Sequence, residues 1–210
     1  MPDTKISDLP AVTDLVSGDQ YVLARAGNSK SIDIDDLSAG ISALVTGPMV
    51  LIQEIVAPSG GSATIDFTSI PGTYRHLELW FVARSEGAAN DILLRFNNDS
   101  AANYRLEVLR GSGSSASAAT LSAQTAANIA SVPATGSGYD AHGKILFPYY
   151  ATGAFNRLAV SSYGLYDGSN SQVGAFSAQW SSTSAVTRIT LFISGTDIKQ
   201  GSIFSLYGIT

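Results

Sequence analysis

The sequence predicts a mainly β protein, with a small N-terminal β-hairpin and helix followed by an antiparallel, jelly-roll-like β-sandwich. Two patterns lead to this prediction. From Met49 onward, apolar and polar residues alternate with the period of two that is typical of half-buried strands. Turn-forming residues interrupt the alternation at short intervals, and no helical periodicity separates them. Many short strands with turns between them are typical of sandwiches and jelly rolls.

The composition favours β-structure with small-residue turns and surfaces that pack against copies of themselves. Charged residues make up 14% of the 210 residues, compared with about 25% in an average soluble domain. The net charge of −5 and the lack of basic clusters argue against nucleic-acid binding and against binding to anionic membranes. No cysteine is present, which excludes a disulfide framework, and no stretch is apolar enough to predict membrane insertion.

Residues 1–48 are too few to fold around a core of their own, so we expect them to attach to a neighbouring protein. Residues 19–25 and 29–34 are predicted to be two short strands. Gly27 and Asn28, between them, favour the positive φ angles that a tight hairpin turn requires.

A short helix is predicted to begin at Ile34, because Asp33 is a favourable N-cap, and to end at Gly47 and Pro48. Its apolar stripe consists of Leu37, Ile41 and Leu44. Two interpretations are open. The stripe either lies on the following domain or forms a three-fold bundle between copies of the chain.

Residues 49–210 are predicted to form the sandwich. The turn at residues 69–72 should have its φ fixed by Pro71 and its strained position taken by Gly72. Strands are expected at residues 50–57, 63–68, 74–84, 91–97, 104–110, 140–148, 157–163, 173–180, 185–193 and 203–209.

The strand at residues 74–84 has two different faces. Its core face is expected to carry Leu77, Leu79, Phe81 and Ala83. The opposite face, which is apolar in the middle and charged at the ends, carries Glu78, Trp80, Val82 and Arg84. A Trp and a Val that point outward indicate a surface covered by another subunit.

Residues 111–138 differ from the rest of the domain, because they are rich in Ser, Ala, Thr and Gly. They are predicted to form a long excursion with a short strand at residues 125–132. A loop of this length is expected to be either functional or mobile.

No catalytic motif is recognisable, so we expect no enzymatic activity, no cofactor and no metal centre. His76 begins an apolar strand and is interpreted as structural. His142 lies in a polar segment and is the one weak candidate for acid–base or metal chemistry. A glycosidase would need two paired carboxylates, and the sequence suggests no pairing among Asp91, Asp99 and Asp140. The oxygen-rich run at residues 97–99 is either a turn or a calcium site.

The N-terminal segment resembles the anchor of tailed-phage fibre and spike proteins. The resemblance covers residues 5–45 and is carried by the runs at residues 5–10, 18–25 and 27–37. It implies attachment to other virion proteins, of the tail or of the capsid, through residues 5–45.

The larger domain resembles a β-sandwich that recurs in phage virion proteins. The matching runs are residues 65–71 leading to 74–79, residues 94–99 leading to 103–104, and residues 201–209. The resemblance implies a homotrimer on the particle surface, assembled in the host cytoplasm, that contacts glycans on the host surface. A capsid decoration protein that stabilises the shell is the alternative.

If the domain binds glycans, exposed aromatic rings should carry the binding, because a ring offers a flat apolar face to a sugar. The aromatic candidates are Tyr149, Tyr150, Tyr163, Tyr166 and Trp180. Their expected polar partners are Arg84, Asn97 and Asp99. For each ring, packing in the core or against another subunit is the alternative interpretation.

Overall fold

The computed structural model describes residues 20–25, 28–33 and 48–210, and the chain divides into the units Met1–Gly47 and Pro48–Thr210. In the first unit, β1 (Gln20–Arg25) pairs with β2 (Asn28–Asp33) in antiparallel register, from Gln20 opposite Asp33 to Arg25 opposite Asn28. The two predicted N-terminal strands are therefore present. The predicted helix and its stripe of Leu37, Ile41 and Leu44 lie outside the described residues.

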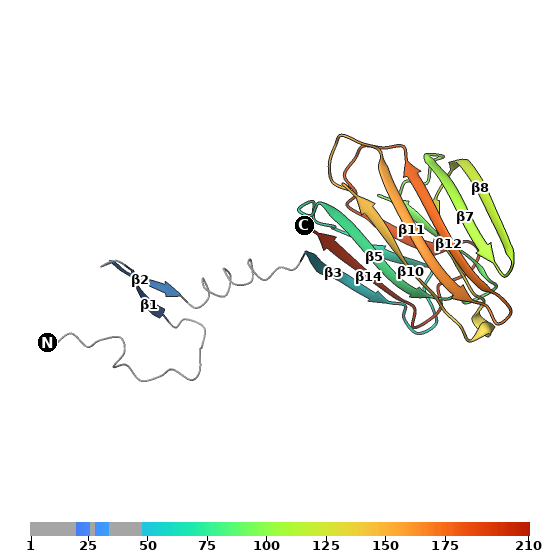
Figure 1. Cartoon of the computed structure of the whole chain (residues 1–210), viewed down its shortest axis with the longest axis horizontal. Helices are drawn as coiled ribbons and strands as arrows, with labels where there is room; N and C mark the ends of the chain where they lie inside the picture. The colour runs from blue at the N-terminus through green and yellow to red at the C-terminus, as the bar shows by residue number, and fades with distance from the viewer. Residues whose placement is uncertain (1–19, 26–27, 34–47) are drawn as a thin grey trace. The chain divides into compact units, whose positions relative to one another are not determined.

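The second unit, hereafter the head, is a sandwich of two antiparallel sheets, as Figure 1 shows. The larger sheet has the order β3 (Met49–Val56), β14 (Ile203–Ile209), β5 (His76–Ala83), β10 (Ala141–Pro148), β11 (Arg157–Tyr166), β12 (Ser171–Trp180), β7 (Tyr104–Ser112) and β8 (Ser115–Gln124). The smaller sheet has the order β4 (Thr64–Phe67), β13 (Ile189–Ile193), β6 (Asn90–Phe96) and β9 (Ala127–Val132). A short 3₁₀ turn follows at Thr135–Ser137. No helix within the described residues is long and apolar enough to cross a membrane.

The predicted antiparallel sandwich is confirmed, and each predicted strand of the head has a counterpart. One turn was assigned wrongly. The residue with positive φ is Ser69, at 54°, and not Gly72. The left-handed residue thus lies three positions before Gly72 and ahead of Pro71, whose φ is fixed, and Ile70 is buried with its N–H bonded to the carbonyl of Thr187.

Residues 111–138 are mostly strand and not a loop. They complete β7 and contain all of β8 and β9, of which only the last matches the predicted strand at residues 125–132. β8 pairs only with β7, so it is an edge of the larger sheet. None of its ten residues is charged or proline, and both of its faces are solvent-accessible.

The core lies between the two sheets. The predicted core face of β5 is confirmed, since Leu77, Leu79, Phe81 and Ala83 are all buried. Phe96 of the smaller sheet meets the ring of Phe147 edge-on, with centroids 5.7 Å apart. Each such fully buried side chain contributes roughly 1.5–3 kcal/mol relative to an exposed one.

A buried cation joins the loops at one end of the sandwich. The guanidinium of Arg157 donates hydrogen bonds to the carbonyls of Tyr149, Thr152, Thr183 and Ser184. These carbonyls belong to the loops after β10 and β12, which would otherwise bury backbone acceptors without partners. Arg157 is thus a structural residue that the sequence pattern did not reveal.

Aromatic rings cover inward-facing glycines in the larger sheet. The ring of Tyr163 covers Gly174, its cross-strand neighbour, and the ring of Tyr74 covers Gly208. A Cβ atom at either position would overlap the ring. Glycine is required here because it leaves room for the ring, and not because of its φ angle.

Replacing Gly174 by Ala should therefore destabilise the head by about 1–3 kcal/mol, since an overpacked core must shift its side chains. The melting temperature should fall by roughly 2–4 °C per kcal/mol for a chain of this size. The matched control is Gly153→Ala, because nothing lies within 4 Å of a Cβ built there. Equal melting temperatures for the two variants in a calorimeter would contradict the packing argument.

Candidate functional site

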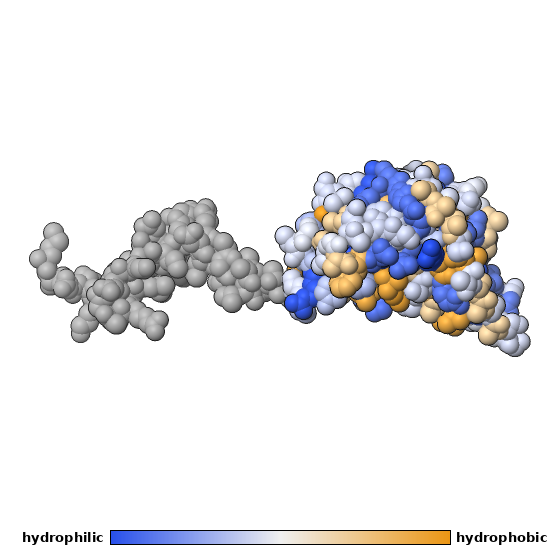
Figure 2. Space-filling view, turned by 90° about the horizontal axis from the view of Figure 1, so that it is seen from above, coloured by the Kyte–Doolittle hydropathy of each residue, from blue (hydrophilic) through white to orange (hydrophobic). Residues whose placement is uncertain are grey.

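The outward side chains of the larger sheet form an apolar surface, which we call the outer face. Of the thirteen large apolar side chains exposed in the described part of the chain, ten lie on this face. They are Met49, Leu51, Val56, Trp80, Leu109, Leu146, Val160, Tyr166, Val173 and Ile203. Figure 2 shows apolar residues gathered along the lower side of the head, which faces the viewer in Figure 1.

The strand register aligns these side chains in rows across the sheet. One row runs from Val56 through Ile203, Val82, His142 and Gly164 to Val173. The next row includes Trp80, Lys144, Ser162, Ala175 and Leu109. The small residues Ser162 and Gly164 on β11 and Ala175 on β12 therefore lie between larger apolar side chains, and the surface is hollowed above them.

A depression of about 790 Å³ occupies the middle of the outer face. Its lining includes Trp80, Val82, His142, Lys144 and Tyr207. The indole of Trp80 is 50% exposed, and its ring centroid lies 6.3 Å from that of Tyr207. The prediction that Trp80 and Val82 point away from the core is therefore confirmed.

Charge is nearly absent from the centre of this face. The outward positions of β14, β5, β10, β11 and β12 carry one acid, Glu78, and one lysine, Lys144. Lys144 Nζ lies 3.8 Å from Glu78 Oε2, while the other carboxylate oxygen, Oε1, accepts a 2.5 Å hydrogen bond from Trp80 Nε1. The two opposite charges neutralise each other within the surface.

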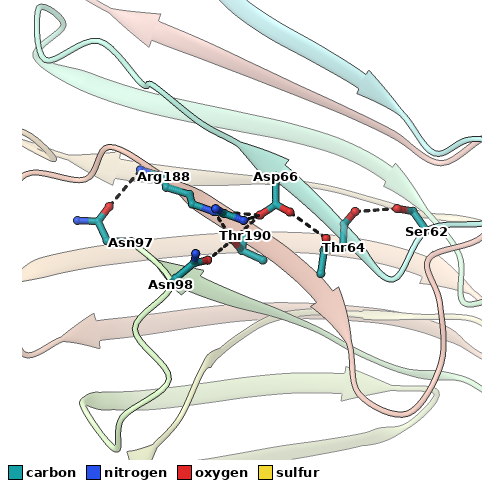
Figure 3. A network of polar contacts seen from close by, with 7 residues as sticks. All are labelled: Ser62, Thr64, Asp66, Asn97, Asn98, Arg188 and Thr190. Atoms are coloured by element: carbon teal, nitrogen blue, oxygen red, sulfur yellow. Dashed lines mark hydrogen bonds and ion pairs between the residues drawn. The ribbon is translucent and has the colours of Figure 1, made fainter.

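The outer side of the smaller sheet is built differently, as Figure 3 shows. Asp66 Oδ1 accepts hydrogen bonds from Arg188 Nη2 at 2.8 Å and from Thr190 Oγ1 at 2.5 Å. Its Oδ2 accepts a third bond from Thr64 Oγ1 at 2.9 Å. None of the thirteen exposed large apolar side chains lies on this sheet. One outer side of the sandwich is thus polar and internally hydrogen-bonded, and the other is largely apolar.

Three of the predicted glycan-binding residues do come together, but in a structural network. Trp180 is buried, and its ring centroid lies 5.6 Å from that of Phe96. Its Nε1 donates a 2.6 Å hydrogen bond to Asp99 Oδ2. Asn97 Oδ1 accepts from the backbone N–H groups of Thr187 and Arg188. The expectation that Trp180 is an exposed platform is therefore wrong, because its ring fills the core.

The run at residues 97–99 has the geometry of a turn. Asn97 and Asn98 have φ angles of 50° and 59°, which Asn tolerates better than most residues. Asp99 Oδ1 accepts from the N–H of Ala101, and Oδ2 also accepts from Asn103. No group of three or more His, Asp or Glu side chains in the described residues is arranged to hold a metal ion.

Tyr150 and Tyr163 are also buried, so exposure was wrongly expected for them as well. The hydroxyl of Tyr150 donates to the carbonyl of Pro71, which ties the turn before β5 to the end of β10. The ring of Tyr163 covers Gly174, as described above, and its hydroxyl lies 3.0 Å from Ser131 Oγ.

The remaining candidates lie at opposite ends of the head. Tyr149 lies at the Arg157 end of β11, where its carbonyl accepts from Arg157 Nη1 and its ring meets His76 at 4.6 Å. Tyr166 ends the same ten-residue strand, about 30 Å away. The structure therefore separates them, and they cannot contact one small sugar together.

The Tyr166 end, which we call the far end, carries a group of exposed polar and aromatic residues. Tyr166 meets Tyr139 edge-on at 4.8 Å, and Arg84 Nε donates to Asp140 Oδ1 at 3.0 Å. The chain enters the head at the opposite end, where Met49 pairs with Ile209. Of the predicted residues, Tyr166 and Arg84 are brought to one end.

The histidines and the candidate carboxylates have separate surroundings. His76 Nδ1 accepts the N–H of Tyr149 at 3.1 Å, so its predicted structural role is confirmed, and His142 lies on the outer face. Asp91 accepts hydrogen bonds from Arg110, Asn128 and Ser131. Asp140 is paired with Arg84. Each of these carboxylates belongs to its own hydrogen-bonded group.

The sequence analysis missed most of the outer face. Val160, Val173 and Leu109 lie on three different strands, and only the strand order brings them together with Trp80. A signal was present, because residues 157–180 contain apolar residues at both odd and even positions and only two charged residues, Arg157 and Asp167.

Neither a scan against protein-family models nor searches of curated proteins and of solved structures give a match for this chain.

The stability of the head should fall in acid, because aspartates that include Asp66 and Asp99 have lowered pKa values. Burial raises the pKa of Asp66, but hydrogen bonds from Thr190, Arg188 and Thr64 outweigh this and lower it. Hydrogen bonds from Asn103 and Trp180 lower the pKa of Asp99. Such groups stabilise the fold above the ordinary aspartate pKa, near 4, and this stabilisation is lost as the pH falls through the lowered value.

We expect Asp99→Asn to melt lower than the parent at pH 7, and the difference to shrink steadily below about pH 4. The reason is that the parent loses its carboxylate bonds in acid, whereas the variant lacks them at every pH. Melting curves followed by circular dichroism between neutral and acid pH measure this. Parallel curves for the two proteins would count against the role of Asp99.

Proposed function

We propose that this chain is a non-enzymatic structural protein of a tailed-phage particle, a fibre- or spike-type appendage. Residues 5–45 would attach it to other virion proteins, and the head would face the host. The observation that carries the proposal is the outer face, because an isolated soluble domain rarely leaves so many large apolar side chains on one side of a sheet. A protein that works inside a larger assembly has a use for such a face.

The division of the chain supports the same proposal. The described residues of the first unit form a two-stranded sheet, and a two-stranded hairpin is at best marginally stable in water by itself. Such a segment gains order by docking on a neighbour. The resemblance of residues 5–45 to phage anchors supplies the identity of that neighbour as another virion protein.

Host-surface glycan binding is the second part of the proposal, and the geometry favours the far end for it. Tyr166 and Tyr139 offer exposed rings there, beside the paired Arg84 and Asp140. A ring with a polar neighbour suits the alternating C–H and O–H groups of a sugar. The far end is also the end of the head opposite the point where the chain enters it.

Particles that lack this protein provide the test. We expect them to remain intact but to lose adsorption to host cells, and particles carrying a chain without residues 5–45 should behave in the same way. The alternative, a capsid decoration protein, is favoured by the outer face as well, since an apolar surface can clamp neighbouring shell subunits. Particles that adsorb normally but rupture on heating would show that the alternative is correct.

The glycan proposal makes a narrower prediction about two exposed tyrosines. Tyr166→Ala should weaken binding on a glycan array by at least about ten-fold, which corresponds to one lost ring contact of about 1.4 kcal/mol. Tyr149→Ala is the matched control, because it removes a similarly exposed ring from the opposite end of the head. Equal binding by parent and Tyr166→Ala would rule out the far end as the sugar site.

A further inference from the structure

We infer that the outer face is the contact between copies of this chain, so that the heads associate through their larger sheets. The inference rests on the proposed function in one respect, namely that the protein works as a multi-copy appendage. Its own support comes from the size, the polarity and the relief of the outer face.

The first support is area. Exposed apolar side chains extend across the larger sheet from Leu51 and Val56 on β3 to Leu109 on β7. Eight strands about 4.8 Å apart, each about eight residues long, cover roughly 1,000 Å². A stable protein interface buries about 800 Å² on each partner. The outer face is therefore large enough for a lasting contact with a second head.

The second support is the arrangement of charge. Two copies of a charged surface repel each other, whereas the centre of the outer face carries only the mutually paired Glu78 and Lys144. Removing water from this centre leaves no isolated charge, which is the condition under which an apolar contact forms at low cost. The other outward charges, Glu54 on β3 and Arg105 and Glu107 on β7, lie toward the edges of the sheet, where the rim of an interface is ordinarily polar. The polar outer side of the smaller sheet, with Asp66 and Arg188, does not meet this condition.

The third support is relief. The depression beside Trp80 and Val82 is hollow, whereas Val173, Leu109 and Val56 are more than half exposed around it. A second copy brings both features, so its protruding side chains have a hollow to enter. A single sugar would cover Trp80 and its immediate neighbours and would leave the outer apolar side chains in water.

The test measures the oligomeric state of the purified full-length chain by size-exclusion chromatography with light scattering. We expect a multimer and not a monomer. Val173→Asp and Val160→Asp each place a charge on the outer face and should raise the dissociation constant at least ten-fold. The double variant should be a monomer that still melts cooperatively.

Phe155→Asp is the matched control. Phe155 is 63% exposed, nearly the same as Val173 at 64%, but it lies in the loop between β10 and β11 and not on the outer face. This variant should keep the parent's oligomeric state. Should it dissociate as readily as Val173→Asp, the effect would be one of added charge alone, and the inference would be overturned.

Tryptophan fluorescence gives a second readout. The chain has two tryptophans, and Trp180 is buried within the head, so a change of emission on dissociation reports Trp80. We expect the emission of the double variant to be shifted to longer wavelength than that of the parent. In a Trp80→Phe background this shift should disappear.

Three results would overturn the inference: a monomeric parent, a multimer that both Asp variants leave intact, or a monomeric parent whose Trp80 emission shifts when an oligosaccharide is added. The last result would assign the outer face to a sugar. These outcomes are separate from the adsorption test, because a multimer without a role in adsorption contradicts the proposed function and leaves the interface standing.

Discussion

The alternation of side chains along a strand is the constraint on which the rest of this structure depends. Every second residue of the larger sheet must face away from the core, whatever the core requires. The smaller sheet covers only the inner side, so the outward residues of eight strands meet either water or a partner. Their chemistry is therefore a direct record of what the protein is built to contact.

The outward side chains of the two sheets differ in polarity. The smaller sheet places Asp66, Thr190 and Arg188 outward and satisfies them with one another, so that its surface is stable in water. The larger sheet places Trp80, Val160 and Val173 outward with small residues between them. The same fold thus has one outer surface whose polar groups are paired and one outer surface that is largely apolar.

Much of the fold was predictable because a strand with one polar and one apolar side has an alternating pattern that can be recognised in the sequence. β5 is an example, since its alternation located both the core residues and the outward Trp80. β8 was missed because its Ser and Ala residues carry no alternation, and β7 is the only strand with which it pairs. Trp180 was misjudged because an aromatic ring suits a core and a sugar equally, and only the register, which aligns it with Tyr104 and Arg157, places it inside. The structural role of Arg157 could not be predicted from the sequence, since its partners are backbone carbonyls of the loops after β10 and β12.

The open edge of β8 has a consequence for how the protein is made. Ten residues without a charge or a proline present unpaired N–H and C=O groups, and natural sheets usually protect such edges. A newly synthesised chain therefore offers a template on which strands of its siblings can add, one after another, into fibrils. The risk is greatest while the chain is free and concentrated. Charged or proline substitutions in β8 would lengthen the useful life of the free chain in a test tube.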